Sequence, residues 1–284
     1  MQQRMQIIRV MAEGIAATDE LGKGKPVRTA RGISVCCTNG LAQVARLVIS
    51  GAHGLVPNMK LLTVKSVPVL GWSSPKALTL RPPASSLVFL IFGLTLFGLG
   101  EAFLIAAGVG VSPWTVFAEG LTNVTGWSIG FATFVISVSV LLLWIPLKQT
   151  PGLGTILNAV IIALVLEYLL PFLPRFESTL ASVVMAALGV LITGIGGAIY
   201  LIANLGPGPR DGLMTGLQAV TGQPIALVRT GLEISVVVIG WLLGGTVGIG
   251  TVLFAFGIGP SIALGMLALQ AIFPPRQPSP GQRT

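Results

Sequence analysis

Charged side chains are scarce in this sequence. Asp, Glu, Lys and Arg make up only 9% of the 284 residues, while hydrophobic types account for 53%, and the mean hydropathy is +0.88. Soluble domains carry about 25% charged residues. The composition therefore excludes an ordinary soluble domain and predicts an integral membrane protein whose main partner is the lipid bilayer.

Cysteine and histidine are also nearly missing. The two cysteines, Cys36 and Cys37, are direct neighbours, and neighbouring cysteines rarely satisfy disulfide geometry. His53 is the single histidine, so the sequence holds too few nitrogen and sulfur ligands for a metal site built on His and Cys. We therefore expect neither a metal nor a cofactor.

Motifs of nucleotide binding and of nucleophilic catalysis are missing as well. No GxxxxGK(S/T) phosphate loop occurs, and no GxGxxG follows a strand. No Ser or Cys has a visible base that would activate it as a nucleophile. These absences predict that the protein is not an enzyme.

Long apolar runs are what the sequence has in their place. Six runs reach the length of about 20 residues that crosses a bilayer core as a helix. They cover approximately residues 87–107, 128–147, 154–173, 181–203, 225–243 and 251–271. The runs are apolar on all sides, whereas the strands of a membrane barrel alternate with period two. We predict an all-α, polytopic transmembrane bundle.

The chain also repeats itself. Residues 93–173 align without a gap to residues 189–269, an offset of 96 residues, and many of the identities fall on Gly and Pro. Each copy holds three predicted spans, and an odd number of spans turns the second copy upside down in the membrane. We predict two inverted three-span repeats, an arrangement common in secondary transporters.

One segment in each repeat is too short to span. Residues 113–125 and 209–221 each begin with Pro after a Gly-rich break and are followed by Gly, as is typical of a helix start and end. A helix of this length extends about 20 Å, which does not cross a bilayer. Each repeat is expected to hold an extra short helix, either on the membrane surface or re-entrant.

The basic residues predict the orientation. Eleven of the 17 Lys and Arg precede residue 82. Such an arm can bind nucleic acid, but the positive-inside rule favours a positively charged cytoplasmic flank, so no nucleic-acid partner is expected. We predict an inner-membrane (plasma-membrane) protein with both termini in the cytoplasm. Its parts are a basic, disordered extension at 1–86, repeats at 87–173 and 181–271, and a Pro-rich tail at 274–284.

A few ionisable residues interrupt the apolar runs at a cost in free energy. Glu101, inside the first span, is either a cation- or proton-coupling carboxylate or a neutral acid hydrogen-bonded between helices. Arg210 and Asp211 open the second short helix, where they either bind an anionic group or only anchor and cap the helix. The predicted substrate site comprises Glu101, Gly110, Pro113, Trp114, Gly206, Pro209, Arg210 and Asp211.

Two further sets have a structural interpretation beside a functional one. Arg229 and Glu233 are four residues apart and share one helix face, so they form either a structural ion pair or a gate. Small and polar residues inside the spans favour close helix packing or polar contacts between helices. These residues are Gly98, Gly100, Gly154, Thr155, Asn158, Gly194, Gly196, Gly250 and Thr251.

Four motifs carry a resemblance to a known family. They are PGLGTILN at 151–158, LGPGPRDGLM at 205–214, RTGLE at 229–233 and GGTVGIGT at 244–251. Together with the Gly/Pro break after the first span, they resemble YczE/YitT-type bacterial membrane proteins, and the second half is similar to the actinobacterial YczE-like branch. The resemblance covers about residues 87–271 and implies a multi-span inner-membrane protein of largely unassigned activity.

Two functions of different class fit these patterns. The first is a secondary transporter or permease for a small solute or ion, because matching Gly/Pro interruptions in two halves point to a transport site. The second is a non-transporting membrane protein that binds or regulates a partner, because few polar groups are available for a substrate. A homo-oligomer or a membrane protein partner is compatible with both.

The predicted topology can be tested with reporter tags. A tag inserted after Lys148 should lie in the cytoplasm and a tag after Gly244 outside, because three spans separate the two equivalent loops. Paired cytoplasmic and periplasmic reporters measure this directly. Tags that land in the same compartment would contradict the inverted repeats.

Overall fold

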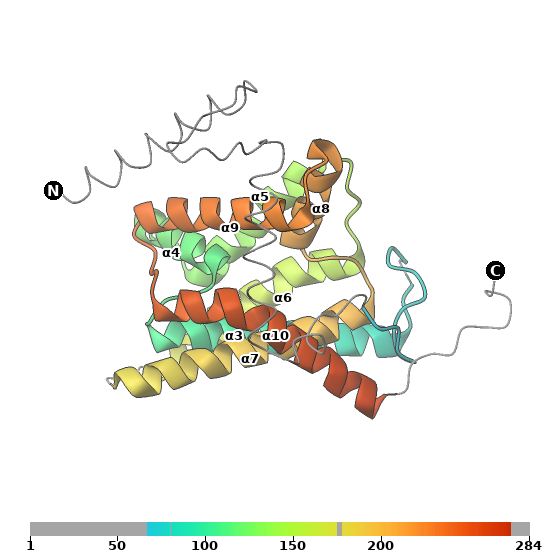
Figure 1. The fold of residues 1–284 in the computed structure, drawn as a ribbon, viewed down its shortest axis with the longest axis horizontal. Helices are drawn as coiled ribbons and strands as arrows, with labels where there is room; N and C mark the ends of the chain where they lie inside the picture. The colour runs from blue at the N-terminus through green and yellow to red at the C-terminus, as the bar shows by residue number, and fades with distance from the viewer. Residues whose placement is uncertain (1–66, 80, 175–177, 274–284) are drawn as a thin grey trace, which may run out of the picture. The chain divides into compact units, whose positions relative to one another are not determined.

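The computed structural model describes residues 67–79, 81–174 and 178–273, and these residues form eight α-helices and no strand. The helices are α3 (Ala84–Ala107), α4 (Pro113–Thr125), α5 (Ile129–Trp144), α6 (Leu153–Leu169), α7 (Thr179–Ala203), α8 (Pro209–Thr221), α9 (Ile225–Leu242) and α10 (Ile249–Ile272) (Figure 1). A 3-10 turn, η2 (Leu170–Phe172), extends α6. The prediction of an all-α membrane protein is confirmed.

Five helices of the described chain are long and apolar enough to cross a membrane: α3, α6 with η2, α7, α9 and α10. The predicted second span, 128–147, was too long, because α5 ends at Trp144. Pro146 explains the early end, since its ring nitrogen has no N–H to continue the helical hydrogen bonds. By length and hydropathy, α5 alone falls short of a sixth span, and it passes only together with α4, which meets it at an angle of 114°.

The helix boundaries follow the sequence repeat. The two short helices, α4 and α8, begin at Pro113 and Pro209 and end at Thr125 and Thr221, so both ends keep the offset of 96 residues. The starts of α5 and α9, and those of α6 and α10, have the same offset. The same local signals, proline at the first helical position and glycine after the last, therefore act in both repeats.

The equivalent helices α3 and α7 pack closely against each other. A Cβ at Gly100 would lie 2.6 Å from the Gly189 oxygen, and a Cβ at Gly196 would lie 2.6 Å from the Gly93 oxygen. Gly93 also contacts Tyr200, so residue numbers rise along α3 as they fall along α7, and the two helices are antiparallel. Small residues are what allow two backbones to approach this closely inside a membrane.

The loops that precede the two short helices make equivalent contacts, each with the other repeat. Gly110, with a φ of 113°, lies against Gly248, and its repeat equivalent Gly206, with a φ of 110°, lies against Gly152. The Gly154 amide donates to the Leu205 oxygen at 2.7 Å, and the equivalent Gly250 amide donates to the Val109 oxygen at 2.8 Å. Each repeat thus makes the same contact with the other, as in an isologous interface.

The remaining residues predicted for packing lie at helix contacts too. Gly98 faces Val165 of α6, and Gly194 faces the equivalent Ser261 of α10. The Thr155 hydroxyl donates to the Pro207 oxygen at 2.7 Å, and it also accepts a hydrogen bond from the Gly152 amide. The Thr251 hydroxyl accepts a hydrogen bond from the Gly248 amide at 3.3 Å.

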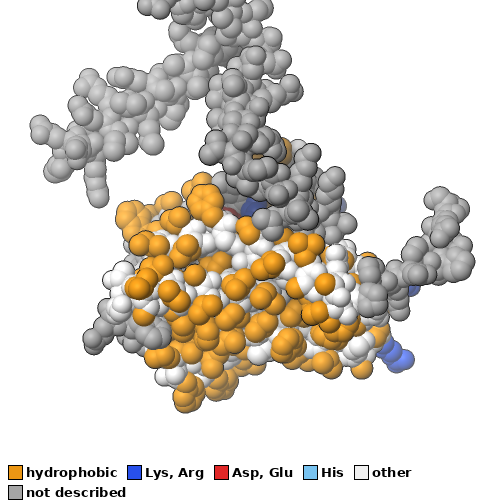
Figure 2. Space-filling model, turned by 60° about the horizontal axis from the view of Figure 1, so that its bottom comes forward, with side chains coloured by type: hydrophobic (Ala, Val, Ile, Leu, Met, Phe, Trp, Pro, Cys, Tyr) orange, Lys and Arg blue, Asp and Glu red, His pale blue; other side chains and the backbone are white. Residues whose placement is uncertain are grey.

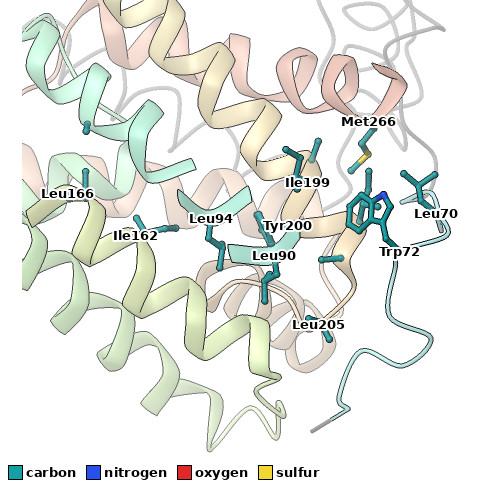
Figure 3. Packing of buried hydrophobic residues seen from close by; sticks show 14 residues of the cluster. Leu70, Trp72, Leu90, Leu94, Ile162, Leu166, Ile199, Tyr200, Leu205 and Met266 are labelled. Carbon is teal, nitrogen blue, oxygen red and sulfur yellow. The ribbon is translucent and has the colours of Figure 1, made fainter. Parts of the chain in front are cut away.

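The segment before α3 differs from the predicted extension 1–86. Its residues 67–79 pack against the helices: Trp72 stacks on Phe89 with ring centroids 4.2 Å apart, and Ser86 donates to the Trp72 oxygen at 2.6 Å. Leu70 and Trp72 are buried with α3, α6, α7 and α10 in the main hydrophobic cluster (Figure 3). Residues 1–66 of the predicted extension and the predicted tail 274–284 lie outside the described residues.

The outer surface of the helices is apolar. Figure 2 shows one face covered mainly by hydrophobic side chains. Large hydrophobic residues such as Phe172, Leu242 and Phe256 are between 73% and 82% exposed. A soluble monomer rarely exposes a contiguous apolar surface of this kind, so lipid is the environment that these helices fit.

The reciprocal glycine contacts predict a large difference between two similar substitutions. Gly196→Ala should destabilise the fold by about 1–3 kcal/mol, because the new methyl group meets α3 backbone that cannot move aside. Gly231→Ala in α9 is the matched control, because no atom lies within 4 Å of its Cβ position, and it should be neutral or stabilising. Thermal unfolding in detergent measures both, and equal melting temperatures for the two variants would contradict the packing described.

Candidate functional site

The N-terminal tips of the two short helices meet inside the bundle. Trp114 is the second residue of α4 and Arg210 the second of α8, so they are repeat equivalents. The Arg210 guanidinium lies over the Trp114 ring, 5.3 Å from its centroid, within the range of a cation–π interaction. The point where equivalent residues touch is the centre of the reciprocal arrangement.

A cavity of about 210 Å³ lies at this centre. All of the long helices except α5 contribute to its wall, together with the tips of α4 and α8. Most of the wall is apolar, with aromatic and aliphatic side chains such as Phe97, Ile162 and Phe254. Its polar side chains are Asn158, Tyr200, Arg210, Asp211, Arg229 and Glu233.

Asp211 and Tyr200 form one polar unit of this wall. The Tyr200 hydroxyl donates to Asp211 Oδ2 at 2.6 Å. Asp211 lies in the first turn of α8, where a negative charge is favoured by the helix dipole. The Asp211 carboxylate is thus stabilised by the Tyr200 hydroxyl of α7 and by the dipole of its own helix.

Arg210 is the charged side chain of the wall whose charge is balanced least by neighbouring residues. Within the described chain its guanidinium makes no hydrogen bond or ion pair, although Glu101, Asp211 and Glu233 all act on it electrostatically. A guanidinium offers five N–H donors in a planar fork that matches carboxylates and phosphates. Arg210 is therefore available to an anionic group inside the cavity.

Arg229 and Glu233 lie on one face of α9, as predicted, and are paired. The Arg229 Nε donates to Glu233 Oε1 at 2.9 Å, and the two side chains are 53% and 29% exposed. An ion pair with this exposure contributes little stability in water, roughly 0–1 kcal/mol. Its position on the cavity wall leaves both predicted roles, structural pair and gate, open.

Glu101 lies directly behind the tip of α4 and is only 1% exposed. Its Oε2 accepts hydrogen bonds from the Ser112 hydroxyl at 2.8 Å and the Thr115 hydroxyl at 2.7 Å, and these two hydroxyls are 2.8 Å apart. Its Oε1 is buried without a partner among the described residues. Pro113 and Trp114, between the two hydroxyl residues, line the cavity, so Glu101 holds one wall of the cavity from behind.

The predicted substrate residues divide into two groups. Five of them line the cavity: Pro113, Trp114, Pro209, Arg210 and Asp211. Glu101 lies behind the wall, and Gly110 and Gly206 lie in the tight loop contacts instead. Asn158, predicted as a polar contact between helices, lies on the cavity wall, where Gly208 faces its amide.

Sequence reasoning missed three side chains of the candidate site, Tyr200, Ser112 and Thr115. Tyr200 is one of only two tyrosines in the chain and ends a predicted span, a position where its hydroxyl needs a partner. Ser112 and Thr115 flank Pro113 and Trp114, which were selected. Their role depends on the loop 108–112 folding back to Glu101, and no local pattern indicates that.

A metal is not suggested by the residues present. Across residues 67–79, 81–174 and 178–273, no group of three His, Cys, Asp or Glu side chains is arranged to hold an ion.

Comparison with known proteins gives the family. A model described as a family of unknown function (DUF6198) matches residues 84–266, which include every residue of the cavity wall. The chain belongs to this family. No solved structure matches the chain.

Curated relatives of this family member are likewise described only in general terms. The chain is 41% identical over 196 residues to an uncharacterized protein of Haemophilus influenzae, covering 69% of this chain and 89% of that protein. It is 32% identical over 176 residues to the uncharacterized membrane protein YczE of Bacillus subtilis, covering 60% and 77% of the two chains. The predicted resemblance to YczE-like membrane proteins is confirmed, and the resemblance to the YitT type stays a prediction.

The Tyr200–Asp211 contact predicts different effects for the two tyrosines. Tyr200→Phe should lower the free energy of unfolding by about 1.5–3 kcal/mol, because a partly buried hydrogen bond to a carboxyl group is lost. Tyr168→Phe is the matched control, because Tyr168 is 71% exposed, and it should have little effect. Thermal unfolding of the purified variants checks this, and an undisturbed Tyr200→Phe protein would show that the contact is not formed.

Proposed function

We propose that this protein is a secondary transporter for a small solute that carries an anionic group. The observation that carries the proposal is the cavity between the tips of α4 and α8, whose largely apolar wall holds six polar or charged side chains. Binding sites between interrupted helices at the interface of two repeats are the common plan of such transporters.

The inverted arrangement of the repeats is part of this proposal. The equivalent helices α3 and α7 are antiparallel, and the contacts between repeats are reciprocal. If α3 and α7 both cross the membrane, they cross it in opposite directions, and each repeat starts on a different side. In this arrangement α5, the equivalent of α9, is the sixth span despite its 16 residues, and both termini are cytoplasmic in the plasma membrane.

We further propose that the two short helices are re-entrant. The tip of α4 lies beside Glu101 inside α3, while its other end returns to the loop after α9, where Asn123 donates to the Gly244 oxygen at 2.8 Å. The helix α8 does the same from the other side, with Gly216 packed against Leu147 in the loop after α5. Irregular backbone at membrane depth is stable where it is buried in protein or lines a cavity.

The cavity wall indicates the kind of solute. A volume of about 210 Å³ is below the roughly 300–1,000 Å³ of sites for drug-sized ligands, so the solute is small. Arg210 supplies donors for an anionic group, Asn158 a neutral amide, and Trp114 an aromatic face. Asp211 is already engaged by Tyr200, which leaves Arg210 as the main charge that selects the solute.

One observation favours the alternative, a non-transporting protein that binds or regulates a partner. The helix α9 buries only Val236 and Gly240, although it is as apolar as a membrane span. Its free surface can contact lipid, a second copy of the chain or another membrane protein. A stable partner that co-purifies, together with the absence of flux, would support this function.

Flux measurements test the transport proposal. The protein in liposomes should move one member of a panel of small monovalent and divalent organic and inorganic anions, and Arg210→Ala should reduce that flux by about ten-fold or more, because a charged hydrogen bond is lost. Arg81→Ala is the matched control, because Arg81 is exposed outside the helices. A flux that is equal in both variants would contradict the role of Arg210.

The same panel can be screened by thermal shift, since a ligand that binds the folded state raises the melting temperature. A compound that stabilises the wild type but not Arg210→Ala identifies the solute without any assumption about transport. If no compound of the panel stabilises the protein or crosses the membrane, the proposal is wrong.

A further inference from the structure

Three oxygen atoms behind the tip of α4 form a closed triangle. Glu101 Oε2, the Ser112 hydroxyl and the Thr115 hydroxyl are each 2.7–2.8 Å from the other two. All three side chains are buried, with exposures of 1%, 0% and 3%. Distances of this size are those of O–H···O hydrogen bonds, so each side of the triangle needs a hydrogen atom.

Counting hydrogen atoms distinguishes the two charge states of Glu101. Each hydroxyl can donate only one hydrogen, so Ser112 and Thr115 supply two of the three that the triangle needs. The third is available only if the carboxyl itself carries a proton on Oε2, in which case Oε2 donates to one of the two hydroxyls and accepts from the other. With an ionised carboxylate, one pair of oxygens would face each other without a hydrogen, and the buried charge would lack a hydrogen-bonded cation.

We propose that Glu101 is a proton-binding site that is occupied in this conformation. The other oxygen supports this assignment, because Oε1 has no donor among the described residues, and an unbonded carbonyl is tolerated far better than an unbonded half of a carboxylate. The short oxygen–oxygen distances also leave no room for a sodium ion between the three atoms. The proton site does not require that the protein transports a solute.

The charged groups around Glu101 indicate what its proton controls. Arg210 of α8 acts electrostatically on Glu101, while α7 and α10 carry no charged residue. The nearest carboxyls of α8 and α9, Asp211 and Glu233, are engaged by Tyr200 and Arg229. On other faces, Glu119 of α4 accepts from the Thr246 amide, and Glu167 of α6 packs against Gly130. Arg210 is thus the cation that responds to the charge of Glu101.

This pairing links the proton to the solute, an extension that rests on the proposed function. When Glu101 loses its proton to water, only two hydrogen atoms remain for the three sides of the triangle, so one side must open, while both hydroxyls can still donate to the carboxylate. The ionised carboxylate then competes with the solute for Arg210. The anionic solute therefore binds to the protonated protein, and proton and solute are carried in the same direction.

Infrared spectroscopy tests the proton site on the purified full-length protein. A protonated carboxyl has a C=O stretching band that is separate from the carboxylate bands and shifts in D2O. We expect this band at neutral pH, at the frequency of a carbonyl without a hydrogen bond because Oε1 has no donor. It should be lost in Glu101→Gln and retained in Asp211→Asn.

Thr115→Val keeps the test decisive if Glu101→Gln does not fold. This variant removes one hydroxyl of the triangle and should move the band without abolishing it. A band that is present in Glu101→Gln, or one that appears in the wild type only when sodium is replaced by choline, would overturn the proposal.

The infrared measurement tests the proton site and the flux measurement tests the transport function, so either proposal can fail without the other. A Glu101 band without flux of any anion leaves the proton site intact and removes the transport function. Anion flux that is unaffected by a proton gradient, together with no Glu101 band, removes the proton site and leaves the transporter.

Discussion

The close antiparallel contact of α3 with α7 is the constraint on which the other features of this protein depend. Gly93 and Gly100 on one helix, and Gly189 and Gly196 on the other, let the two backbones approach to distances that no larger side chain permits. Because the helices are repeat equivalents, the contacts of the loops that follow them are made twice. The loops before α4 and α8 turn back on this pair, and this brings the two helix tips to one central cavity.

The chemistry lies where the two repeats differ. Trp114 and Arg210 are equivalent positions, as are Thr115 and Asp211, and Asn158 is equivalent to Phe254. In the first repeat the acid is on the long helix and the hydroxyls are on the short one; in the second, Asp211 is on the short helix and the hydroxyl of Tyr200 is on the long one. A repeated scaffold thus presents two different carboxyl groups at related places.

Much of the architecture could be predicted because its signals are local. Apolar runs of about 20 residues predict spans, and Pro and Gly mark the two ends of α4 and α8 at the residues where these helices begin and end. The predictions were less accurate where hydropathy and packing disagree. The run 128–147 is apolar throughout, yet α5 stops before Pro146. Residues 67–79 were predicted as part of a disordered extension, yet they bury Leu70 and Trp72.

The sequence by itself determined the membrane environment, the repeat, the short helices and five residues of the cavity wall, because composition, periodicity and helix ends are properties of neighbouring residues. Only the tertiary structure decided that Glu101 faces two hydroxyls, that Tyr200 holds Asp211 and that Asn158 lines the cavity. These contacts join helices that are distant in the sequence or separated by a reversing loop. Their geometry depends on how closely whole helices pack, and no residue pattern along the chain expresses that distance.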